Sequence, residues 1–518
     1  MYVADSHESR NLDRVAMDFG LAGLVLMENA SRSIFQLALD FWPPLKNSKI
    51  PVFVLAGPGQ NGGDGYVLAR LFAAQGHPVV IAQVGSAPKG DAAINLALAK
   101  KLGLNITPLG VSSDPWPELP PQALLIDALL GTGLDRPVTG LFAETIEKAA
   151  NHPGPKLAVD LPSGLSADTG LALGPVIPAD LTATVGVYKK GLFLNDGPRL
   201  SGQIRVADLG FCPQMIEKAR PQGLYLDAAL ARSFLPSRTQ DGHKGTFGHA
   251  CVMGGGAGKT GALALAALGA LRSGVGLVTA ASPKNSPLLL NSDLISAMTL
   301  PLPEESSGHF ALEACEPLVA FMTPKKKALG LGPGLGLGQG AQELVRKLTV
   351  FLERPMLLDA DALTALEDRP ELVSKAMAPR LLTPHPGEAG LLLGLSPKEI
   401  QVDRFGSLST LAKITKATVL LKGQYTLIME PETGRYLVNS TGNPVLAVGG
   451  SGDILTGLLT GFLAQGLSPF AAAGLGAFVH GRAADLAASR LGSRGILPQQ
   501  VAAFLPEVLT ALADPNYV

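Results

Sequence analysis

Short apolar runs of strand length alternate with segments of helical periodicity along most of the sequence, and this alternation restricts the fold more than any other feature. The first unit consists of residues 50–56, a glycine-rich turn and the helical pattern of residues 64–76. The next apolar run, residues 78–85, follows directly, and the alternation restarts at residue 249. Strands that alternate with helices form parallel sheets with helices on both faces, and such strands are apolar throughout because both faces are buried. The sequence therefore predicts an α/β protein.

The alternation is interrupted between about residues 212 and 244, where strong strands are missing and prolines gather. A chain of 518 residues is long enough for two large domains or three smaller ones. We therefore predict a first domain at residues 1–215, a linker at residues 216–240 and a second domain at residues 241–518.

Composition excludes several classes of function. The 42 Lys and Arg residues nearly balance the 43 Asp and Glu residues, so the net charge of -1 gives no footprint for nucleic acid and no polybasic membrane anchor. Three scattered cysteines are too few for a disulfide framework or a zinc cluster. The first residues lack the apolar core of a signal peptide, and the apolar run of residues 261–271 is shorter than the ~20 residues that span a bilayer. We expect a cytoplasmic protein that binds neither nucleic acid nor membranes.

The glycine loop after the first strand has the spacing of a phosphate-binding turn. Gly57, Gly59 and Gly62 follow the G-x-G-x-x-G pattern, which lets backbone N–H groups approach a phosphate at a helix N-terminus. Dinucleotide-binding folds also need an acidic residue at the end of the next strand to hold the ribose. That strand ends in IAQVGS without an acid, which argues against an NAD-dependent oxidoreductase. Asn61 and Asp64 within the loop favour a binding site over a purely structural turn.

Two further strands end in an aspartate followed by a glycine-containing loop. Asp127 precedes a Gly-Thr-Gly loop, and Asp160 precedes the sharp turn at residues 162–164. A single aspartate in this position is more often a helix cap. Ligands of parallel sheets collect outside the carboxyl ends of the strands, so three such loops favour a common crevice. The Asn, Asp and Ser oxygens there are also the donors that a hard monovalent cation prefers.

In the second half of the chain, the turn Gly449–Asp453 opens a helix. The free N–H groups and the dipole of a helix N-terminus favour an anion. A carboxylate beside a bound phosphate is repelled unless it has a chemical role, so we interpret Asp453 as the group that accepts a hydroxyl proton during phosphoryl transfer. The alternative is a cap of its own helix. The segment Gly254–Thr260 is no P-loop, because Met253 stands where the Walker pattern needs its first glycine.

Two more loops carry one candidate residue each. His385 lies between two prolines, which would hold an imidazole at a fixed position against a ligand, although a lone histidine is more often structural. Lys422 ends a strand and is followed by further hydrogen-bond donors, as a nucleotide phosphate site requires. Solvation at the surface is the alternative for this lysine.

Together these motifs occur in the order of a known family. In the first half they are LMENA, GPGQNGGDG, DALLGTGL and VDLPSGL. In the second half they include KGTFGHACVMGG, GPGLG, DADAL, LTPHPGE, LLKGQYT and GNPVLAVGGSGDILTGLL. Over nearly its full length the chain resembles the bifunctional NAD(P)HX repair enzymes, in which an NAD(P)HX epimerase is fused to an NAD(P)HX dehydratase. The resemblance implies an α/β fold with an N-terminal Rossmann-like three-layer parallel-sheet domain, followed by a ribokinase-like α/β domain.

The substrate implied by this resemblance is hydrated NADH or NADPH, which carries water at C6 of the nicotinamide ring and occurs as two epimers. The N-terminal domain is expected to interconvert the R and S forms, with Asp160 as the acid/base at the reacting ring. Asn61, Asp127 and Ser163 match potassium ligands. The implied substrate-binding residues are Gln60, Asn61, Gly62, Gly63, Asp64, Gly131, Thr132, Gly133, Leu134, Asp135, Arg136, Pro137 and Asp160.

The C-terminal domain is expected to dehydrate the S form at the expense of ADP, giving AMP and phosphate, with Mg²⁺ accompanying the nucleotide. A C6 hydroxyl is a poor leaving group until it is phosphorylated. Asp453 would accept its proton, while the Gly450–Gly452 turn stabilises charge on the transferred phosphoryl group. The implied substrate-binding residues are Ala262, Gly334, His385 and Asp453, and the implied nucleotide-binding residues are Lys422, Gly423, Gln424, Tyr425, Thr426 and Gly452.

Two alternatives compete with this interpretation. A ribokinase-type kinase of a small vitamin alcohol would use the same glycine turn, but it predicts a stable phosphorylated product. In the second alternative, the N-terminal domain is a non-catalytic binding module that localises or regulates the other domain. Gln60 replaces the first Asn of the family loop, which usually reads N-N-G-G-D. Because Asn61 and Asp64 remain, we expect a changed affinity of the epimerase for its substrate and no loss of its activity. The resemblance also suggests a homo-oligomer.

Overall fold

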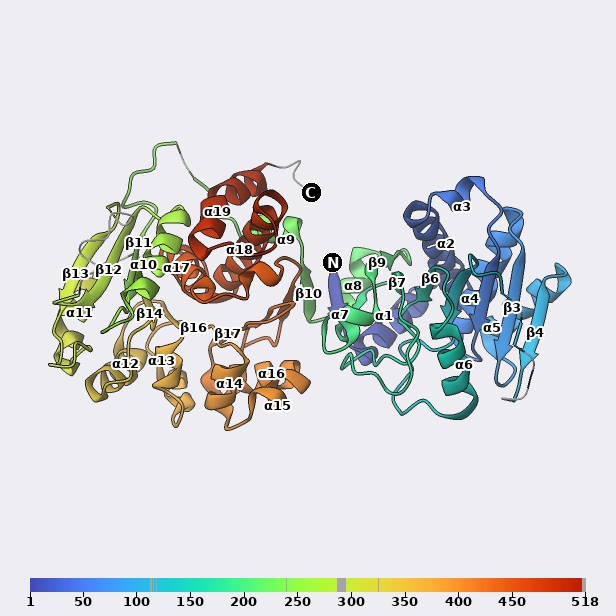
Figure 1. Ribbon diagram of the computed structural model, residues 1–518, viewed down its shortest axis with the longest axis horizontal. Coiled ribbons are helices and arrows are strands. Elements are labelled where there is room, and N and C mark those ends of the chain that lie inside the picture. The colour runs from blue at the N-terminus through green and yellow to red at the C-terminus, as the bar shows by residue number, and fades with distance from the viewer. Residues whose placement is uncertain are drawn as a thin grey trace. The chain divides into compact units, whose positions relative to one another are not determined.

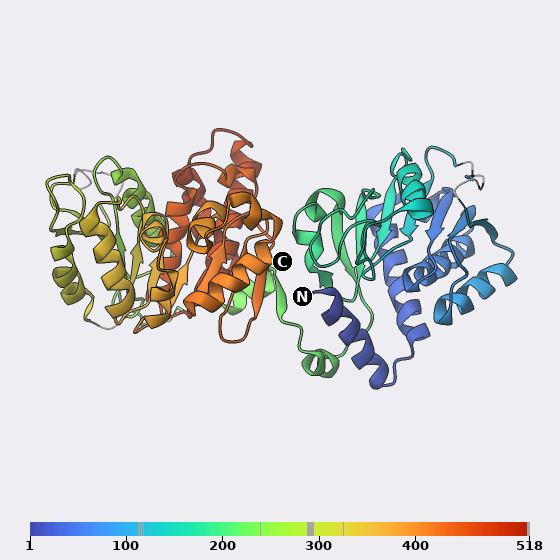
Figure 2. The same ribbon diagram turned by 90° about the horizontal axis from the view of Figure 1, so that it is seen from below.

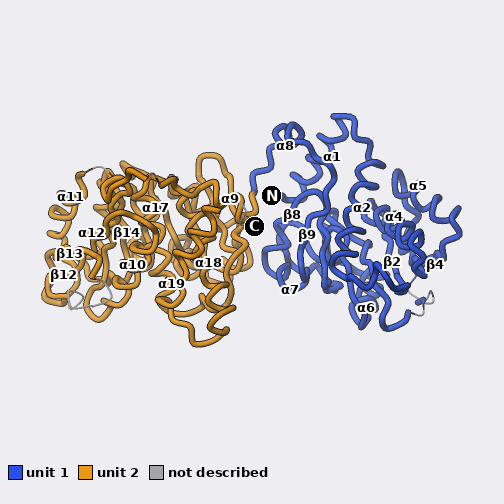
Figure 3. The backbone as a smooth tube through the Cα atoms, turned by 90° about the horizontal axis from the view of Figure 1, so that it is seen from above, with its two compact units in different colours: residues 1–223 blue, residues 224–518 orange. Residues whose placement is uncertain are grey.

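The computed structural model describes the chain except for residues 112, 113, 115, 118, 239, 287–294, 325 and 515–518. The chain folds into two compact units, residues 1–223 and residues 224–518 (Figure 3). The segment predicted as a linker, residues 216–240, contains the end of helix α8 (Pro213–Ala219), strand β10 (Gly223–Leu226) and helix α9 (Ala228–Ser233).

Unit 1 is built on a seven-stranded sheet in the order β4-β3-β2-β5-β6-β7-β9, and each neighbouring pair is parallel (Figure 1). A short parallel pair, β1 with β8, stands apart from this sheet. The parallel α/β class predicted from the sequence is therefore confirmed for this half. The strands are β1 (Tyr2–Ala4), β2 (Val52–Ala56), β3 (Val79–Val84), β4 (Asn105–Leu109), β5 (Leu124–Ala128), β6 (Lys156–Val159), β7 (Leu181–Val185), β8 (Tyr188–Lys189) and β9 (Gln203–Ala207).

Helices cover both faces of this sheet because its central strands are apolar on both sides. Val52 and Val54 of β2 belong to one buried cluster, which also holds Phe72 of α4, whereas Phe53 belongs to a second cluster with Ile146 of α6. These clusters lie on opposite faces, since successive side chains of a strand alternate. The expected three-layer arrangement is confirmed. The helices are α1 (Ser6–Asp18), α2 (Gly23–Phe41), α3 (Pro44–Asn47), α4 (Gln60–Ala74), α5 (Gly90–Lys101), α6 (Gly140–Ala150), η1 (Lys190–Phe193) and α7 (Gly197–Leu200), and α8 lies beside α1 (Figure 2).

The sheet of unit 2 runs β13-β12-β11-β14-β15-β16-β17 with parallel neighbours and continues through β18 and β19 as antiparallel strands. The α/β prediction thus also holds here, with an antiparallel edge. The strands are β11 (His249–Met253), β12 (Leu277–Pro283), β13 (Met298–Leu302), β14 (Lys327–Leu331), β15 (Met356–Leu358), β16 (Arg380–Leu382), β17 (Thr418–Leu421), β18 (Leu427–Met429) and β19 (Tyr436–Asn439).

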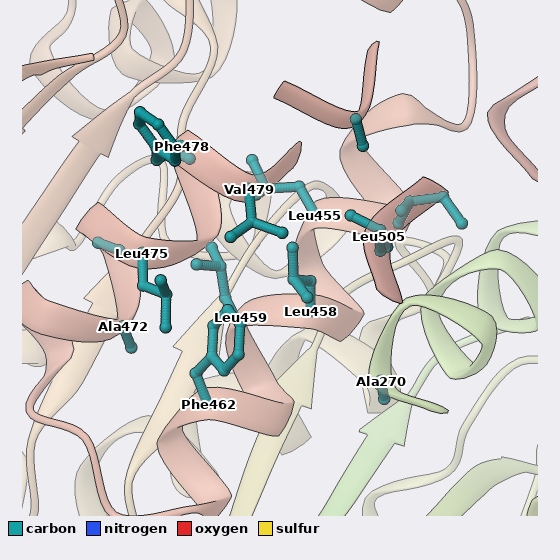
Figure 4. Close-up of a cluster of buried hydrophobic side chains, with 14 of the residues drawn as sticks. Ala270, Leu455, Leu458, Leu459, Phe462, Ala472, Leu475, Phe478, Val479 and Leu505 are labelled. Carbon is teal, nitrogen blue, oxygen red and sulfur yellow. The ribbon is translucent and has the colours of Figure 1, made fainter. Parts of the chain in front are cut away.

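Helix α17 (Ser451–Ala464) forms the centre of the core of unit 2, where it packs against α10 (Thr260–Arg272) and α18 (Pro469–Leu491) (Figure 4). Glycines allow α10 and α17 to touch backbone to backbone. A Cβ atom at Gly457 would lie 1.8 Å from the carbonyl oxygen of Ala266, and one at Gly269 would lie 2.1 Å from that of Ile454. The remaining helices are η4 (Leu312–Ala314), α11 (Cys315–Met322), α12 (Gln339–Phe351), α13 (Asp361–Thr364), η5 (Pro370–Lys375), α14 (Pro386–Leu393), α15 (Pro397–Val402), α16 (Arg404–Thr415), η6 (Pro444–Leu446) and α19 (Pro498–Ala513).

Within the described residues, no helix combines the length and the apolar character needed to cross a bilayer.

Candidate functional site

A cavity of about 720 Å³ opens at the carboxyl ends of the strands of unit 1. The start of α4, which follows β2, contributes Gln60, Asn61 and Asp64 to its wall, and the loop after β5 contributes residues 131–137. Asp160, which follows β6, lies in the same wall. The structure thus brings the three predicted loops together. Gly62 and Gly63 are buried in the first turn of α4 instead, and a Cβ atom at Gly62 would lie 1.9 Å from the carbonyl oxygen of Gly57.

Asp160 forms a buried ion pair at the bottom of this cavity. Its Oδ1 lies 2.6 Å from Nζ of Lys189, whose side chain is only 1% exposed. Lys189 also donates to the carbonyl oxygen of Val185 at 2.5 Å, and the backbone N–H of Thr132 donates to Oδ2 of Asp160 at 3.3 Å. Sequence reasoning missed Lys189, because a Lys-Lys pair after a short strand is typical of a solvated surface.

The backbone at Asp160 has an unusual conformation. Its φ angle is 69°, and the N–H of Leu161 donates to the carbonyl oxygen of Val159 at 2.9 Å, which closes a three-residue turn around the aspartate. Such a turn with positive φ is strained for a residue with a side chain, by about 1–3 kcal/mol, and such strain is concentrated at functional sites. The turn directs the carboxylate toward Lys189 and the Thr132 loop.

Three further carboxyl groups line the same cavity: Asp13 from α1, Asp64 from α4 and the exposed Asp135. Burial raises the pKa of Asp13 to about 6, with Lys189 opposing and Asp160 adding to this rise. Burial and the negative charge of Asp160 raise the pKa of Asp64 well above its usual value, although a hydrogen bond from Ser31 Oγ opposes the shift. Asp13 was missed by sequence reasoning because it lies within an ordinary amphipathic helix.

The three residues predicted as potassium ligands lie at the ends of these strands. Asp127 is fully buried, and its carboxylate accepts hydrogen bonds from Ser163 Oγ (2.5 Å), from the N–H of Ser163 (2.7 Å) and from the N–H of Leu129 (3.3 Å). The structure records no ion pair for Asp127 among the described residues, and burial raises its pKa to about 6. Asn61 lines the cavity, and its buried Nδ2 has no hydrogen-bond partner there.

In unit 2, Asp453 lies in the first turn of α17, directly after the glycine turn. The N-cap residue of this helix is Gly450, whose φ angle of 95° favours glycine. Burial raises the pKa of Asp453 to about 7, and the negative charge of Asp359 adds to this rise while Lys422 opposes it. The carboxyl group is therefore poised to exchange a proton near neutral pH.

A charged network next to Asp453 centres on Asp359, which is 2% exposed. Lys422 Nζ lies 2.8 Å from Asp359 Oδ1 and 3.6 Å from Glu388 Oε2, and Thr456 Oγ1 of α17 donates to Asp359 Oδ2 at 2.6 Å. Burial alone would lower the pKa of Lys422, but its ion pairs with Asp359 and Glu388 raise it. Sequence reasoning assigned no role to Asp359 or Glu388, although both lie within quoted motifs.

The predicted nucleotide-binding residues gather around this lysine. A Cβ atom at Gly452 would lie 3.7 Å from Lys422 Nζ, so the start of α17 adjoins the segment that follows β17. Arg404 of α16 holds that segment by donating to the carbonyl oxygens of Gln424 (2.6 Å) and Tyr425 (3.4 Å). At Gly423, whose φ angle is 155°, a Cβ atom would lie 2.7 Å from the Arg404 guanidinium. Thr426 Oγ1 donates to the carbonyl oxygen of Gly423 at 3.0 Å.

The three remaining predicted residues of unit 2 fall into two places. A Cβ atom at Gly334 would lie 3.1 Å from that of Ala262, so these two residues adjoin. His385 caps α14, since its Nδ1 accepts hydrogen bonds from the N–H groups of Gly387 (3.0 Å) and Glu388 (3.2 Å). Its Nε2 lies 3.4 Å from Glu388 Oε1, which connects His385 to the network of Lys422.

Comparison with known families gives one match in each unit. Residues 23–191 match the family model described as YjeF-related protein N-terminus. Residues 250–507 match the family model described as NAD(P)H-hydrate dehydratase.

Full-length relatives contain both parts. The chain is 38% identical over 521 residues to the bifunctional NAD(P)H-hydrate repair enzyme Nnr of Moorella thermoacetica, covering 99% of this chain and 98% of the relative. It is 34% identical to the enzyme of the same name from Escherichia coli, covering 98% of this chain and 94% of the relative. Among solved structures, the ADP/ATP-dependent NAD(P)H-hydrate dehydratase from Bacillus subtilis, co-crystallised with ATP and Mg²⁺, is 30% identical with a TM-score of 0.48, covering 56% of this chain and 98% of that one.

Proposed function

From the premise that the chain belongs to the family of bifunctional NAD(P)H-hydrate repair enzymes, we propose that the cavity of unit 1 is its epimerase site and that the Asp453 cluster of unit 2 is its dehydratase site. The protein is accordingly an NAD(P)H-hydrate epimerase and dehydratase, and the resemblance inferred from the sequence motifs is confirmed. The placement of the two activities within the chain rests on the geometry described above.

One observation carries the epimerase assignment: three loops that are distant in sequence surround the buried Asp160–Lys189 ion pair in a single cavity. Lys189 places its positive charge next to Asp160, which we assign as the group that accepts a proton. The loop of residues 131–137 and the first turn of α4 supply amide groups and backbone N–H groups around it. We propose that the hydrated nicotinamide ring lies against Asp160, with the residues implied by the resemblance forming the wall around it.

The residues proposed for potassium fit a monovalent cation. Asp127 is a fully buried carboxylate without an ion pair among the described residues, and an uncompensated buried charge is costly. A cation held by oxygens of Asp127, Asn61 and Ser163 would neutralise it, and those are the donor types that hard cations prefer. When bound, potassium would supply positive charge behind the loops that contact the substrate.

The dehydratase assignment rests on Asp453 beside the Gly450–Gly452 turn of the ribokinase-like domain. The turn presents N–H groups to an anion, while the raised pKa of Asp453 suits a group that takes the proton of the C6 hydroxyl as phosphate is transferred to that oxygen. Lys422 lies beside Gly452 and would place a positive charge next to the transferred phosphate. Loss of the phosphorylated hydroxyl as phosphate then restores the ring.

We propose that ADP is the co-substrate and that Mg²⁺ arrives with it. Within the described residues, no group of three His, Cys, Asp or Glu side chains is placed to hold a metal. This fits Mg²⁺, which usually keeps several waters and binds through nucleotide phosphates and one or two carboxylates. The solved Bacillus relative was co-crystallised with ATP and Mg²⁺. A homo-oligomer and a cytoplasmic location stay predictions.

An absorbance assay for reduced nicotinamide tests these assignments. The protein is incubated with a mixture of R- and S-NADHX, K⁺, Mg²⁺ and either ADP or ATP. We expect the absorbance to return for the whole mixture, with ADP as the better nucleotide. Recovery of the S fraction alone would contradict the epimerase assignment. A stable phosphorylated product without recovery of absorbance would instead support the small-molecule kinase alternative.

A further inference from the structure

Helix α1 presents three positions of one face to the epimerase cavity, Ser9, Arg10 and Asp13. The spacing explains this arrangement, because residues three and four apart lie on the same side of a helix. The family model that matches the first half begins only at residue 23, so α1 lies outside it. The epimerase reaction proposed for this cavity assigns no role to these three side chains.

Asp13 differs from the other buried or partly buried carboxyl groups of this wall, a set that leaves out the exposed Asp135. For the described residues, the structure records neither a hydrogen bond nor an ion pair to its carboxyl oxygens, whereas Asp160 is paired with Lys189 and Asp64 accepts from Ser31. The charges that act on Asp13 are Lys189 of β8 and Asp160, which follows β6. Arg10 of the same helix and Asp64 of α4 line the cavity beside it.

Asp13 and Asp160 have different electrostatic surroundings within the same cavity. Burial next to a second carboxylate raises the pKa of Asp13 to about 6. Asp160, in contrast, has the ammonium group of Lys189 as a counter-ion 2.6 Å from its Oδ1. Within one site, a carboxyl group that has a counter-ion and a second one that has none can divide the roles of base and acid.

We propose that Asp13 is a catalytic proton donor of the epimerase site and that it works together with Asp160 as the proton acceptor. The inference rests on the proposed function of the cavity. It assigns the residue that supplies the proton, which the sequence motifs do not show.

The reaction balances with these two groups. The carboxyl proton of Asp13 passes to the C6 oxygen, the C6–O bond breaks, water leaves, and the electron pair of the ring nitrogen forms a double bond to C6. Water then adds to C6 from the opposite face, the electron pair returns to the nitrogen, and the extra proton of that water passes to the Asp160 carboxylate. Proton exchange through the water of the cavity restores both groups. In the reverse direction the two carboxyl groups exchange roles.

The test uses the full chain with Asp13→Asn, Asp13→Glu and a matched control, Asp18→Asn, at the exposed end of the same helix. Epimer interconversion is measured with purified R-NADHX in the absence of nucleotide, after subtraction of the uncatalysed rate. We expect a loss of about 100-fold or more in kcat for Asp13→Asn, since general acid–base groups contribute about 10²–10⁴-fold. Asp13→Glu is expected to recover part of the rate, and Asp18→Asn is expected to behave like the unmodified chain.

Two readouts separate proton donation from a structural role. In the unmodified chain, kcat/KM for epimerisation should fall as pH rises through about 6, because Asp13 must carry its proton, and this fall should persist in Asp13→Glu and disappear in Asp13→Asn. Dehydration of purified S-NADHX by unit 2 should be unchanged in all variants, and the far-ultraviolet circular dichroism of each variant, which reports on both units, should match that of the unmodified chain.

Failure of this inference is distinguishable from failure of the proposed function. If the unmodified chain interconverts the epimers and Asp13→Asn does so at the same rate, the epimerase assignment stands and the role of Asp13 is wrong. If Asp13→Asn lowers the rate but keeps the pH profile, Asp13 positions the substrate and donates no proton. If the unmodified chain does not interconvert the epimers, the assignment of the cavity itself is wrong.

Discussion

Both candidate sites contain one largely buried lysine among several carboxyl groups, but the lysine is paired differently. In unit 1, Lys189 pairs with Asp160, the residue proposed to react. In unit 2, Lys422 pairs with Asp359 and leaves Asp453 without an ion pair in the described part of the chain, so that burial raises the pKa of Asp453 to about 7. The two lysines therefore differ in their partner: Lys189 pairs with the carboxyl group proposed to react in unit 1, and Lys422 pairs with a neighbour of the one proposed to react in unit 2.

Replacing the unpaired carboxyl group of unit 2 should have the largest effect on activity. Asp453→Asn removes the proton acceptor but keeps the shape of the side chain. We expect dehydration of S-NADHX to fall by about 10²–10⁴-fold while nucleotide binding is retained. Steady-state kinetics and calorimetric titration with ADP measure the two effects separately. Dehydration at the unmodified rate would contradict the role of Asp453, and epimerisation by unit 1 provides the internal control.

Replacing Lys189 tests how much the buried ion pair with Asp160 contributes to the stability and activity of unit 1. Lys189→Met leaves the buried Asp160 carboxylate without its counter-ion, and breaking such a pair costs about 3–5 kcal/mol. We expect the unfolding transition of unit 1 to shift to lower denaturant concentration and epimerisation to be lost. Lys190→Met, at the neighbouring half-buried lysine whose pair with Asp5 is longer at 3.4 Å, serves as the matched control and should shift the transition much less. Equal shifts for the two variants would mean that the Asp160–Lys189 pair stabilises unit 1 no more than the Asp5–Lys190 pair does.

The smallest expected effect is a pH dependence of stability. The pKa of Asp453 is about 7 in the folded chain and near 3.8 in the unfolded chain, so the folded state binds the extra proton between these values. The stability that this proton provides is full below about pH 4 and is lost as pH rises through about 7. We expect the unfolding free energy of unit 2 to decrease over this window and Asp453→Asn to lack this part of the decrease, as measured by urea unfolding at several pH values. Identical pH profiles for both chains would contradict the raised pKa.

The sequence predicted the fold class and the loops of both sites because their signals are local. A glycine-rich turn between a strand and a helix places Asn61 at the carboxyl end of a parallel strand. This placement follows from the local sequence and does not depend on distant parts of the chain. The burial of Lys189 and Asp13 was not predictable in this way, because it depends on strands and helices from distant parts of the chain. Likewise, the motif that contains Asp359 was recognisable, but its contact with Lys422 exists only in three dimensions.

The close packing of α10 against α17 has a consequence for motion. A methyl group at Gly269 or Gly457 would collide with the backbone of the facing helix, so the two helices have no free space along this contact. Asp453 lies one turn from Gly457, and the start of α17 therefore moves only together with α10 and the core around it (Figure 4). Amide hydrogens in this part of α17 should exchange with solvent mainly through global unfolding of the unit. The Asp453 side of the site therefore serves as a fixed wall for a bound nucleotide.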